Sequence, residues 1–195
     1  MKTRRREEIS IYVKLVLSAL LVAFFIVNNR FIAIRPMPFA TLSLAILAVI
    51  VAAFIMGPRW AMLVAGAAEA LAAIMFPVGG AWWPEITVGW ILAGLIFGFF
   101  LDRRYNKCNK VLLVNLILSS VFVYVIIHLF YMAGVFYFRL GAAFWTILLI
   151  NRAWPFAVMM VIQIVIAFPL LAYLRRPIDK FLIADDEEEE CSTVQ

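Results

Sequence analysis

Cysteine and histidine are scarce in this 195-residue chain, and their scarcity argues against two kinds of site. The two cysteines, Cys108 and Cys191, both fall on the side that the charge pattern described below assigns to the reducing cytosol, so no disulfide is expected. A single histidine leaves too few ligands for a metal site built from histidine and cysteine. We therefore expect no metal and no other cofactor.

Catalytic motifs are also missing. The sequence has no Ser–His–Asp set, no HExxH motif and no GxxxxGK(S/T) phosphate loop. These absences argue against an enzyme, including one that works within the membrane, and if ATP drives this protein, another chain must bind it. The net charge of +5 does not indicate a nucleic-acid partner, because the basic residues flank apolar runs instead of forming a stripe.

What the sequence has in excess is apolar residues in long uncharged runs. Sixty-six per cent of the residues are hydrophobic and the mean hydropathy is +1.02, whereas soluble domains are about half apolar. Such runs are typical of helices that cross a bilayer, so we predict an all-α integral membrane protein, a single bundle of six transmembrane helices. The predicted spans are residues 11–27, 39–56, 60–76, 87–101, a fifth from about 111, and about 154–174.

The fifth span has no clear end in the sequence. Apolar residues continue from Val111 past His128 to Ile150, which is too long for one crossing of about 30 Å at about 1.5 Å per residue. We therefore place the end of this helix between Gly134 and Gly141, in a stretch that also contains Arg139.

Charge divides the chain into three parts and orients it. Residues 1–10 are a basic N-terminus without a signal-peptide cleavage site, residues 11–176 the transmembrane domain, and residues 177–195 an acidic tail whose run 185–190 is expected to be disordered. If the six spans alternate, thirteen of the seventeen Lys and Arg residues lie on one side, and the positive-inside rule makes that side cytoplasmic. Both termini are then in the cytoplasm.

The four basic residues on the opposite side are all arginines. They are Arg30 after the first span, Arg35 before the second, Arg139 between the fifth and sixth, and Arg152 at the start of the sixth. Arginine pairs with a carboxylate at two points, and tryptophan faces stack on flat rings. With Trp82 and Trp83 of the loop before the fourth span, the arginines indicate a site for an anionic aromatic ligand. The alternative is that all of them are interfacial anchors.

Three other ionisable residues are candidates for specific roles. Glu69 lies inside the third span, where a charge costs about 2.5–3.5 kcal/mol on insertion scales, so it must face the interior, a partner or water. It either contacts the substrate or a nearby arginine, or fixes helix packing. His128 could donate to a ligand, although an interfacial position among aromatics is the preferred interpretation. Glu85 is interpreted as an acid that stabilises the N-terminus of the fourth helix.

Small residues recur four positions apart in two spans, at Ala19 and Ala23 in the first and at Gly94 and Gly98 in the fourth. Such pairs let two helices approach closely, and close packing drives helix association in lipid. The partner helix could belong to this bundle or to another chain.

Several of these features resemble the substrate-binding S components of energy-coupling-factor (ECF) vitamin transporters, most of all the folate group. They are the Gly57-Pro58 turn, the segment GAAEALAAIMFPVGGAWWPEITVGWILAGLIFG, the stretch LGAAFWTILLINR that ends at Arg152, and Arg30 after the first span. The similarity extends over residues 14–174. Two positions differ from the folate pattern: Glu69 replaces the usual aspartate, and apolar residues around Met132 and Ala133 replace a polar pair.

The resemblance implies a multi-pass protein of the bacterial cell membrane that captures a vitamin, folate or a similar anionic ring compound, from outside. It implies a transmembrane coupling subunit, met through Ala19 and Ala23, and two cytoplasmic ATPases as partners. The expected substrate site contains Arg30, Glu69, Trp82, Trp83, His128, Arg139, Asn151 and Arg152. The alternative function is a non-transporting membrane scaffold or assembly factor, similar to cell-shape proteins, in which arginine and tryptophan act only as anchors.

Overall fold

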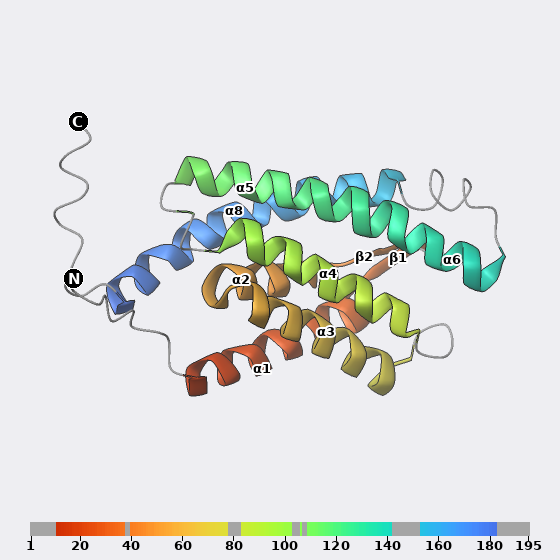
Figure 1. The fold of residues 1–195 in the computed structure, drawn as a ribbon, viewed down its shortest axis with the longest axis horizontal. Helices are drawn as coiled ribbons and strands as arrows, with labels where there is room; N and C mark the ends of the chain where they lie inside the picture. Colours follow the sequence, from red (N-terminus) through yellow and green to blue (C-terminus); the bar gives the residue numbers. More distant parts are fainter. Residues whose placement is uncertain are drawn as a thin grey trace, which may run out of the picture.

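The computed structural model describes residues 11–37, 40–77, 83–102, 106, 109–141 and 153–182, which form a bundle of helices with one small β-hairpin (Figure 1). The α-helices are α1 (Ile11–Val27), α2 (Ile46–Met56), α3 (Pro58–Met75), α4 (Pro84–Leu101), α5 (Asn109–Phe122), α6 (Met132–Leu140) and α8 (Trp154–Leu182). Two π-helical segments, η1 (Asn28–Ile32) and η2 (Val123–Tyr131), continue α1 and α5. The hairpin pairs β1 (Ile34–Met37) with β2 (Ala40–Leu42) in antiparallel fashion.

The helices run back and forth between two ends of the bundle. At one end, on the left in Figure 1, α1 begins, α2 turns into α3, α4 is followed by α5, and α8 ends. We call it the basic end, because Lys14, Arg59, Lys110 and Arg175 all belong to these helix termini. At the other end, which we call the far end, α3 ends, α4 begins and α6 ends. This alternation agrees with the predicted order of spans.

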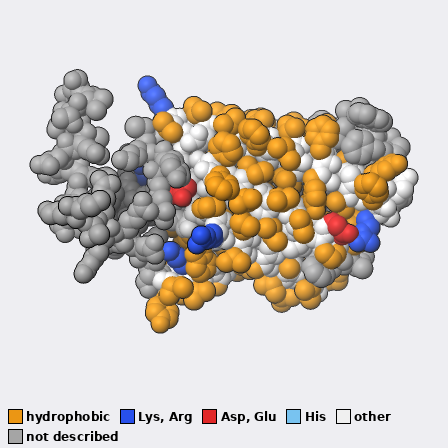
Figure 2. All heavy atoms as spheres, viewed as in Figure 1, with side chains coloured by type: hydrophobic (Ala, Val, Ile, Leu, Met, Phe, Trp, Pro, Cys, Tyr) orange, Lys and Arg blue, Asp and Glu red, His pale blue; other side chains and the backbone are white. Residues whose placement is uncertain are grey.

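Within the described residues, five helical stretches are long and apolar enough to cross a membrane. They are Ile11–Ile32, Pro58–Met75, Pro84–Leu101, Asn109–Arg139 and Pro155–Arg175. Figure 2 shows hydrophobic side chains over much of the surface along the helices, with Lys and Arg side chains gathered at the two ends and most of them at the basic end. Together with the shorter α2 these stretches make six helical segments, which confirms the predicted all-α membrane fold.

The predicted second span is wrong in its first part. The sequence predicts a helix from residue 39, whereas Ala40–Leu42 form strand β2 and the helix begins at Ile46. Pro36 and Pro38 favour extended backbone and lack an N–H, so this stretch suits a hairpin better than a helix. The remaining 11 residues of α2 span about 16 Å, and Ile46 to Phe54 are all buried, so α2 is enclosed by the other helices.

The fifth helix is longer than one bilayer crossing. α5, η2 and α6 follow one another without interruption, passing Gly134 and ending at Gly141, whose φ of 61° is left-handed. The end of this helix was predicted between Gly134 and Gly141, and the helix ends at Gly141, so the prediction is confirmed. The 31 residues of this apolar stretch measure about 46 Å against about 30 Å of hydrocarbon, so its end near Arg139 extends beyond the apolar layer unless the helix tilts strongly.

Two glycines bring the backbone of α4 against that of α3. A Cβ atom at Gly98 would lie 2.2 Å from the Cα of Pro58, and one at Gly94 would lie 2.7 Å from the carbonyl oxygen of Ala61. No side chain fits at either position without moving the helices apart. The interpretation of Gly94 and Gly98 as a packing pair within the bundle is therefore confirmed.

Candidate functional site

A buried ion pair joins the end of the first span to the third. Arg30 in η1 places NH2 3.1 Å from Oε1 of Glu69 in α3, and Nδ2 of Asn29 donates to Oε2 of Glu69 at 2.9 Å. The side chains of Arg30 and Glu69 are only 12% and 8% exposed. Contact with a nearby arginine, one of the roles predicted for Glu69, is therefore confirmed. Because each charge offsets the other, the pair can lie inside an apolar bundle where a single charge would be costly.

Arg30 retains a donor that the described residues do not use. Its Nε is buried and has no hydrogen-bond partner in the described part of the chain. An unsatisfied buried donor costs about 1–3 kcal/mol, and more when it is charged. This N–H is thus a suitable contact for an acceptor atom on a ligand.

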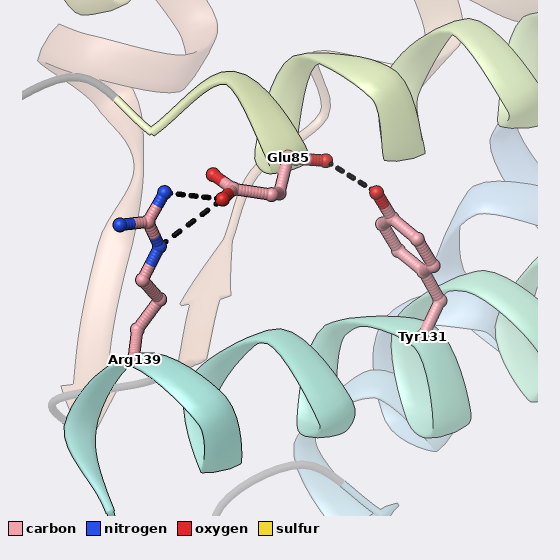
Figure 3. Close-up of polar contacts among 3 residues, drawn as sticks. All are labelled: Glu85, Tyr131 and Arg139. Carbon is pink, nitrogen blue, oxygen red and sulfur yellow. Dashed lines mark hydrogen bonds and ion pairs between the residues drawn. The ribbon is translucent and has the colours of Figure 1, made fainter.

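A second polar cluster lies at the far end, where α4 begins and α6 ends (Figure 3). Nε and NH2 of Arg139 both donate to Oε1 of Glu85, the former at 3.1 Å, and the hydroxyl of Tyr131 in η2 donates to the backbone carbonyl of Glu85 at 2.9 Å. Glu85 lies in the first turn of α4, as its predicted helix-stabilising role requires. The side chains of Arg139 and Glu85 are 48% and 36% exposed, so water and salt weaken this ion pair.

A row of aromatic rings crosses the bundle from α1 to α8. Phe25 meets Trp90 edge-on at 4.9 Å between ring centroids, Trp90 meets His128 edge-on at 5.8 Å, and His128 stacks on Phe156 at 4.9 Å. His128 has the aromatic neighbours that its preferred interpretation predicts, but it lies between α4 and α8, and the helix continues beyond it to Leu140. The row gives the interior flat apolar surfaces.

The contacts between α3 and α4 place these groups at successive levels along α4. Gly98 faces Pro58, Gly94 faces Ala61, and Ile91 faces Gly66. Continuing this antiparallel register puts Glu69 level with Thr87, about half a turn deeper than Glu85. Trp83 directly precedes α4, and Trp90 lies within the far-end half of the helix. Glu69, and with it the Arg30–Glu69 ion pair, thus lies beside the far-end half of α4. Aromatic rings of η2 and α6 lie near the same half of the helix.

The structure describes five of the eight predicted substrate residues and distributes them among three groups. Arg30 and Glu69 form the buried pair, Trp83 and Arg139 lie at the far end, and His128 belongs to the aromatic row. Arg30 and Arg139 share no partner, since each is held by a different glutamate. Trp82, Asn151 and Arg152 lie outside the described residues, as does the side chain of Arg35.

Sequence reasoning missed four residues of these groups: Asn29, Trp90, Tyr131 and Phe156. Two carried a usable signal. Asn29 is part of the polar run that ends the apolar first span, and Trp90 is the tryptophan that follows the Trp82–Trp83 loop in the fourth span. Tyr131 and Phe156 carried none, because their roles depend on which helices are neighbours.

Solved structures of three proteins share this arrangement of helices. FolT bound with folic acid aligns with a TM-score of 0.71 at 22% identity, covering 82% of this chain and 92% of its own. The S component for biotin from an ECF-type ABC transporter aligns at 0.66 and 22% identity, covering 87% and 95%. The S component of a bacterial ECF transporter aligns at 0.58 and 19% identity, covering 89% and 99%. The fold is therefore that of ECF S components.

The sequence leads to the same class. A model of the family described as ECF-type riboflavin transporter, S component, matches residues 10–176, and the chain belongs to this family. The protein is thus a vitamin-binding S component of a transporter, an integral membrane protein and not an enzyme. No curated protein matches the chain.

Proposed function

We propose that this S component captures folate, or a similar anionic ring compound, at the far end of the bundle and delivers it through an ATP-driven coupling module. The observation that supports this proposal is the Arg30–Glu69–Asn29 cluster, a charged hydrogen-bonding group inside an apolar bundle. Ionisable groups at such depth are costly and are generally functional. Trp83 directly before α4 and Trp90 on its far-end half supply flat apolar surfaces.

The described groups suit a ligand whose ring enters first. Arg30 would donate its unused Nε–H to an acceptor on the ring, while Glu69 and Asn29 hold the guanidinium in place. Trp83 and the row around His128 would contact the ring faces. Arg139 would meet a carboxylate at the far end, together with three residues that remain sequence predictions: Trp82, Asn151 and Arg152.

The same proposal assigns the orientation and the partners. The basic end and both termini lie in the cytoplasm, because positively charged residues remain on that side of a membrane. The far end then faces the exterior, where the vitamin is captured. Since the sequence has no phosphate loop, two separate ATPases would act through a transmembrane coupling subunit.

Riboflavin is the second candidate ligand. The description of the matching family names a riboflavin transporter, and Glu69 already offsets the charge of Arg30. A neutral ring with carbonyl acceptors would accept from the remaining Nε–H without a carboxylate on the ligand. The two candidates therefore differ in whether binding needs Arg139 and the predicted site residue Arg152.

Titration of the purified protein with folic acid, riboflavin and biotin tests the proposal. The chain has six tryptophans, so saturable quenching of tryptophan fluorescence reports binding, and the ligand should also raise the unfolding temperature. We expect saturation with folic acid at micromolar concentration or below. Saturation with riboflavin alone would establish the second candidate, and no response to any of the three would contradict vitamin capture by these groups.

Arg152→Ala is expected to weaken folic acid binding at least tenfold, about 1.4 kcal/mol, because a guanidinium–carboxylate pair is lost. The dissociation constant measured by fluorescence titration checks this. Arg59→Ala, at the exposed start of α3 on the basic end, is the matched control and should leave the affinity unchanged. An unaltered affinity for Arg152→Ala would remove this residue from the site.

Ala19→Trp combined with Ala23→Trp is expected to abolish uptake and leave vitamin binding intact. Both alanines are exposed on α1, so bulky rings there would keep another helix away without disturbing the interior of the bundle. Co-purification of the coupling subunit and uptake into membrane vesicles are the measurements. Tyr173→Trp, on the exposed surface of α8, is the control. Normal co-purification of the double variant would exclude this surface as the contact.

A further inference from the structure

We propose that Tyr124 and Tyr131 of η2 are positioning residues for the vitamin site, an inference that rests on the proposed function. The hydroxyl of Tyr131 donates to the backbone carbonyl of Glu85, and the hydroxyl of Tyr124 donates to the backbone carbonyl of Ala153. Glu85 is in the first turn of α4, and Ala153 directly precedes α8. One segment therefore holds the start of two other helices.

These two carbonyls lie where the chain enters the bundle from the far end. A backbone carbonyl has two lone pairs, so it can accept from a tyrosine and still serve its helix. Each bond spans a long stretch of sequence, 46 residues for Tyr131 and 29 for Tyr124, so local structure cannot replace it. The hydroxyls thus determine how each helix start lies against η2.

The aromatic rings of the site depend on these two points. Trp83 lies two residues before Glu85, and its ring contacts Phe136 of α6. Phe156 lies three residues after Ala153 and stacks on His128, which is between the two tyrosines on η2. A shift of either helix start would therefore change the spacing of rings from α4, α8 and η2, and this spacing determines how well a flat ligand fits.

The start of α4 has a second link to the same long helix, the Glu85–Arg139 ion pair. The two links differ in their response to salt. The neutral hydrogen bond of Tyr131 is insensitive to ionic strength, whereas the exposed ion pair is screened. Removing the Tyr131 hydroxyl should therefore leave α4 held by a link that salt weakens, a property that a general loss of packing would not produce.

Tyr124→Phe and Tyr131→Phe, which remove only the hydroxyls, are compared with the wild-type protein, with folic acid and riboflavin as probes. Each variant is expected to bind about threefold to tenfold more weakly, the effect of losing one neutral hydrogen bond, mainly through faster dissociation. Raising the salt concentration from about 0.05 M to about 1 M should accelerate dissociation from Tyr131→Phe more than dissociation from Tyr124→Phe. Unchanged affinities, or equal salt effects on the two variants, would overturn the proposal.

Hydrogen exchange tests the same roles without a ligand. Tyr131→Phe should speed exchange at the amides of residues 86–90, Tyr124→Phe at those of residues 156–159, and Tyr173→Phe, on the exposed surface of α8, at neither. Equal changes in both stretches, or none, would contradict separate positioning. If neither probe binds the wild-type protein, the proposed function fails, while hydrogen exchange still decides whether the tyrosines hold the two helix starts.

Discussion

Glu69→Leu is expected to lower the free energy of unfolding by about 3–5 kcal/mol, because it leaves the guanidinium of Arg30 buried without a counter-charge. The amide of Asn29 also loses its acceptor on Glu69. For a chain of this size such a loss corresponds to a fall in the unfolding temperature on the order of 10 °C. Thermal unfolding in detergent, followed by tryptophan fluorescence, is the measurement.

The double variant Arg30→Met with Glu69→Leu separates stability from function. Replacing both members of a buried ion pair with apolar residues of similar size is often neutral or stabilising, so we expect most of the lost stability to return. Vitamin binding should not return, because the Arg30 donor is absent. A Glu69→Leu variant as stable as the wild type would contradict the ion pair, and a double variant that still binds the vitamin would exclude Arg30 from the site.

Gly98→Ala is expected to have the other large effect, a loss of folded protein. The added methyl group would lie 2.2 Å from the Cα of Pro58, and a backbone atom cannot rotate away as a side chain can. Overpacking of a core typically costs about 1–3 kcal/mol, and separation of α3 from α4 along their whole contact should exceed that range. The yield of monodisperse protein and its unfolding temperature are the measurements.

Gly134→Ala is the matched control for this prediction. Gly134 is also inside a helix, but apart from its own helix backbone and chain neighbours no atom of the described residues lies within 4 Å of the position that a Cβ would occupy. Alanine favours the helical state over glycine by roughly 0.5–1 kcal/mol, so this variant should be as stable as the wild type or slightly more stable. Equal stability of the two alanine variants would show that the protein's stability does not depend on the close α3–α4 contact at Gly98.

The helices were predicted correctly where the length of the apolar run and the turn residues at its ends allowed only one assignment. Long, mostly apolar runs indicated the spans of α1, α3 and α4, and the Gly57-Pro58 turn separated α2 from α3. The prediction was wrong at residues 40–45, because an apolar run next to prolines is compatible with either a strand or a helix. Hydropathy measures transfer into lipid and does not distinguish the two.

The candidate site was predictable as a set of residue types and only partly as a set of contacts. Glu69 had to face a partner because a lone charge inside a span is costly, and Arg30 was one of a few arginines on the correct side. That Arg30 meets Glu69, while Arg139 meets Glu85, follows from which helices are neighbours and how each is rotated. Sequence spacing alone specifies neither.

Membrane insertion, the number of helical segments and their alternation follow from local properties of the chain, since hydropathy, helix length and charged flanks act on each segment separately. Three kinds of contact arise only in the assembled bundle. They are the ion pairs of Glu69 and Glu85 with arginines, the aromatic row, and the tyrosine hydrogen bonds to Glu85 and Ala153. These contacts are a few ångströms long and join residues that are 28 to 65 positions apart in the sequence, so they exist only after the helices have packed.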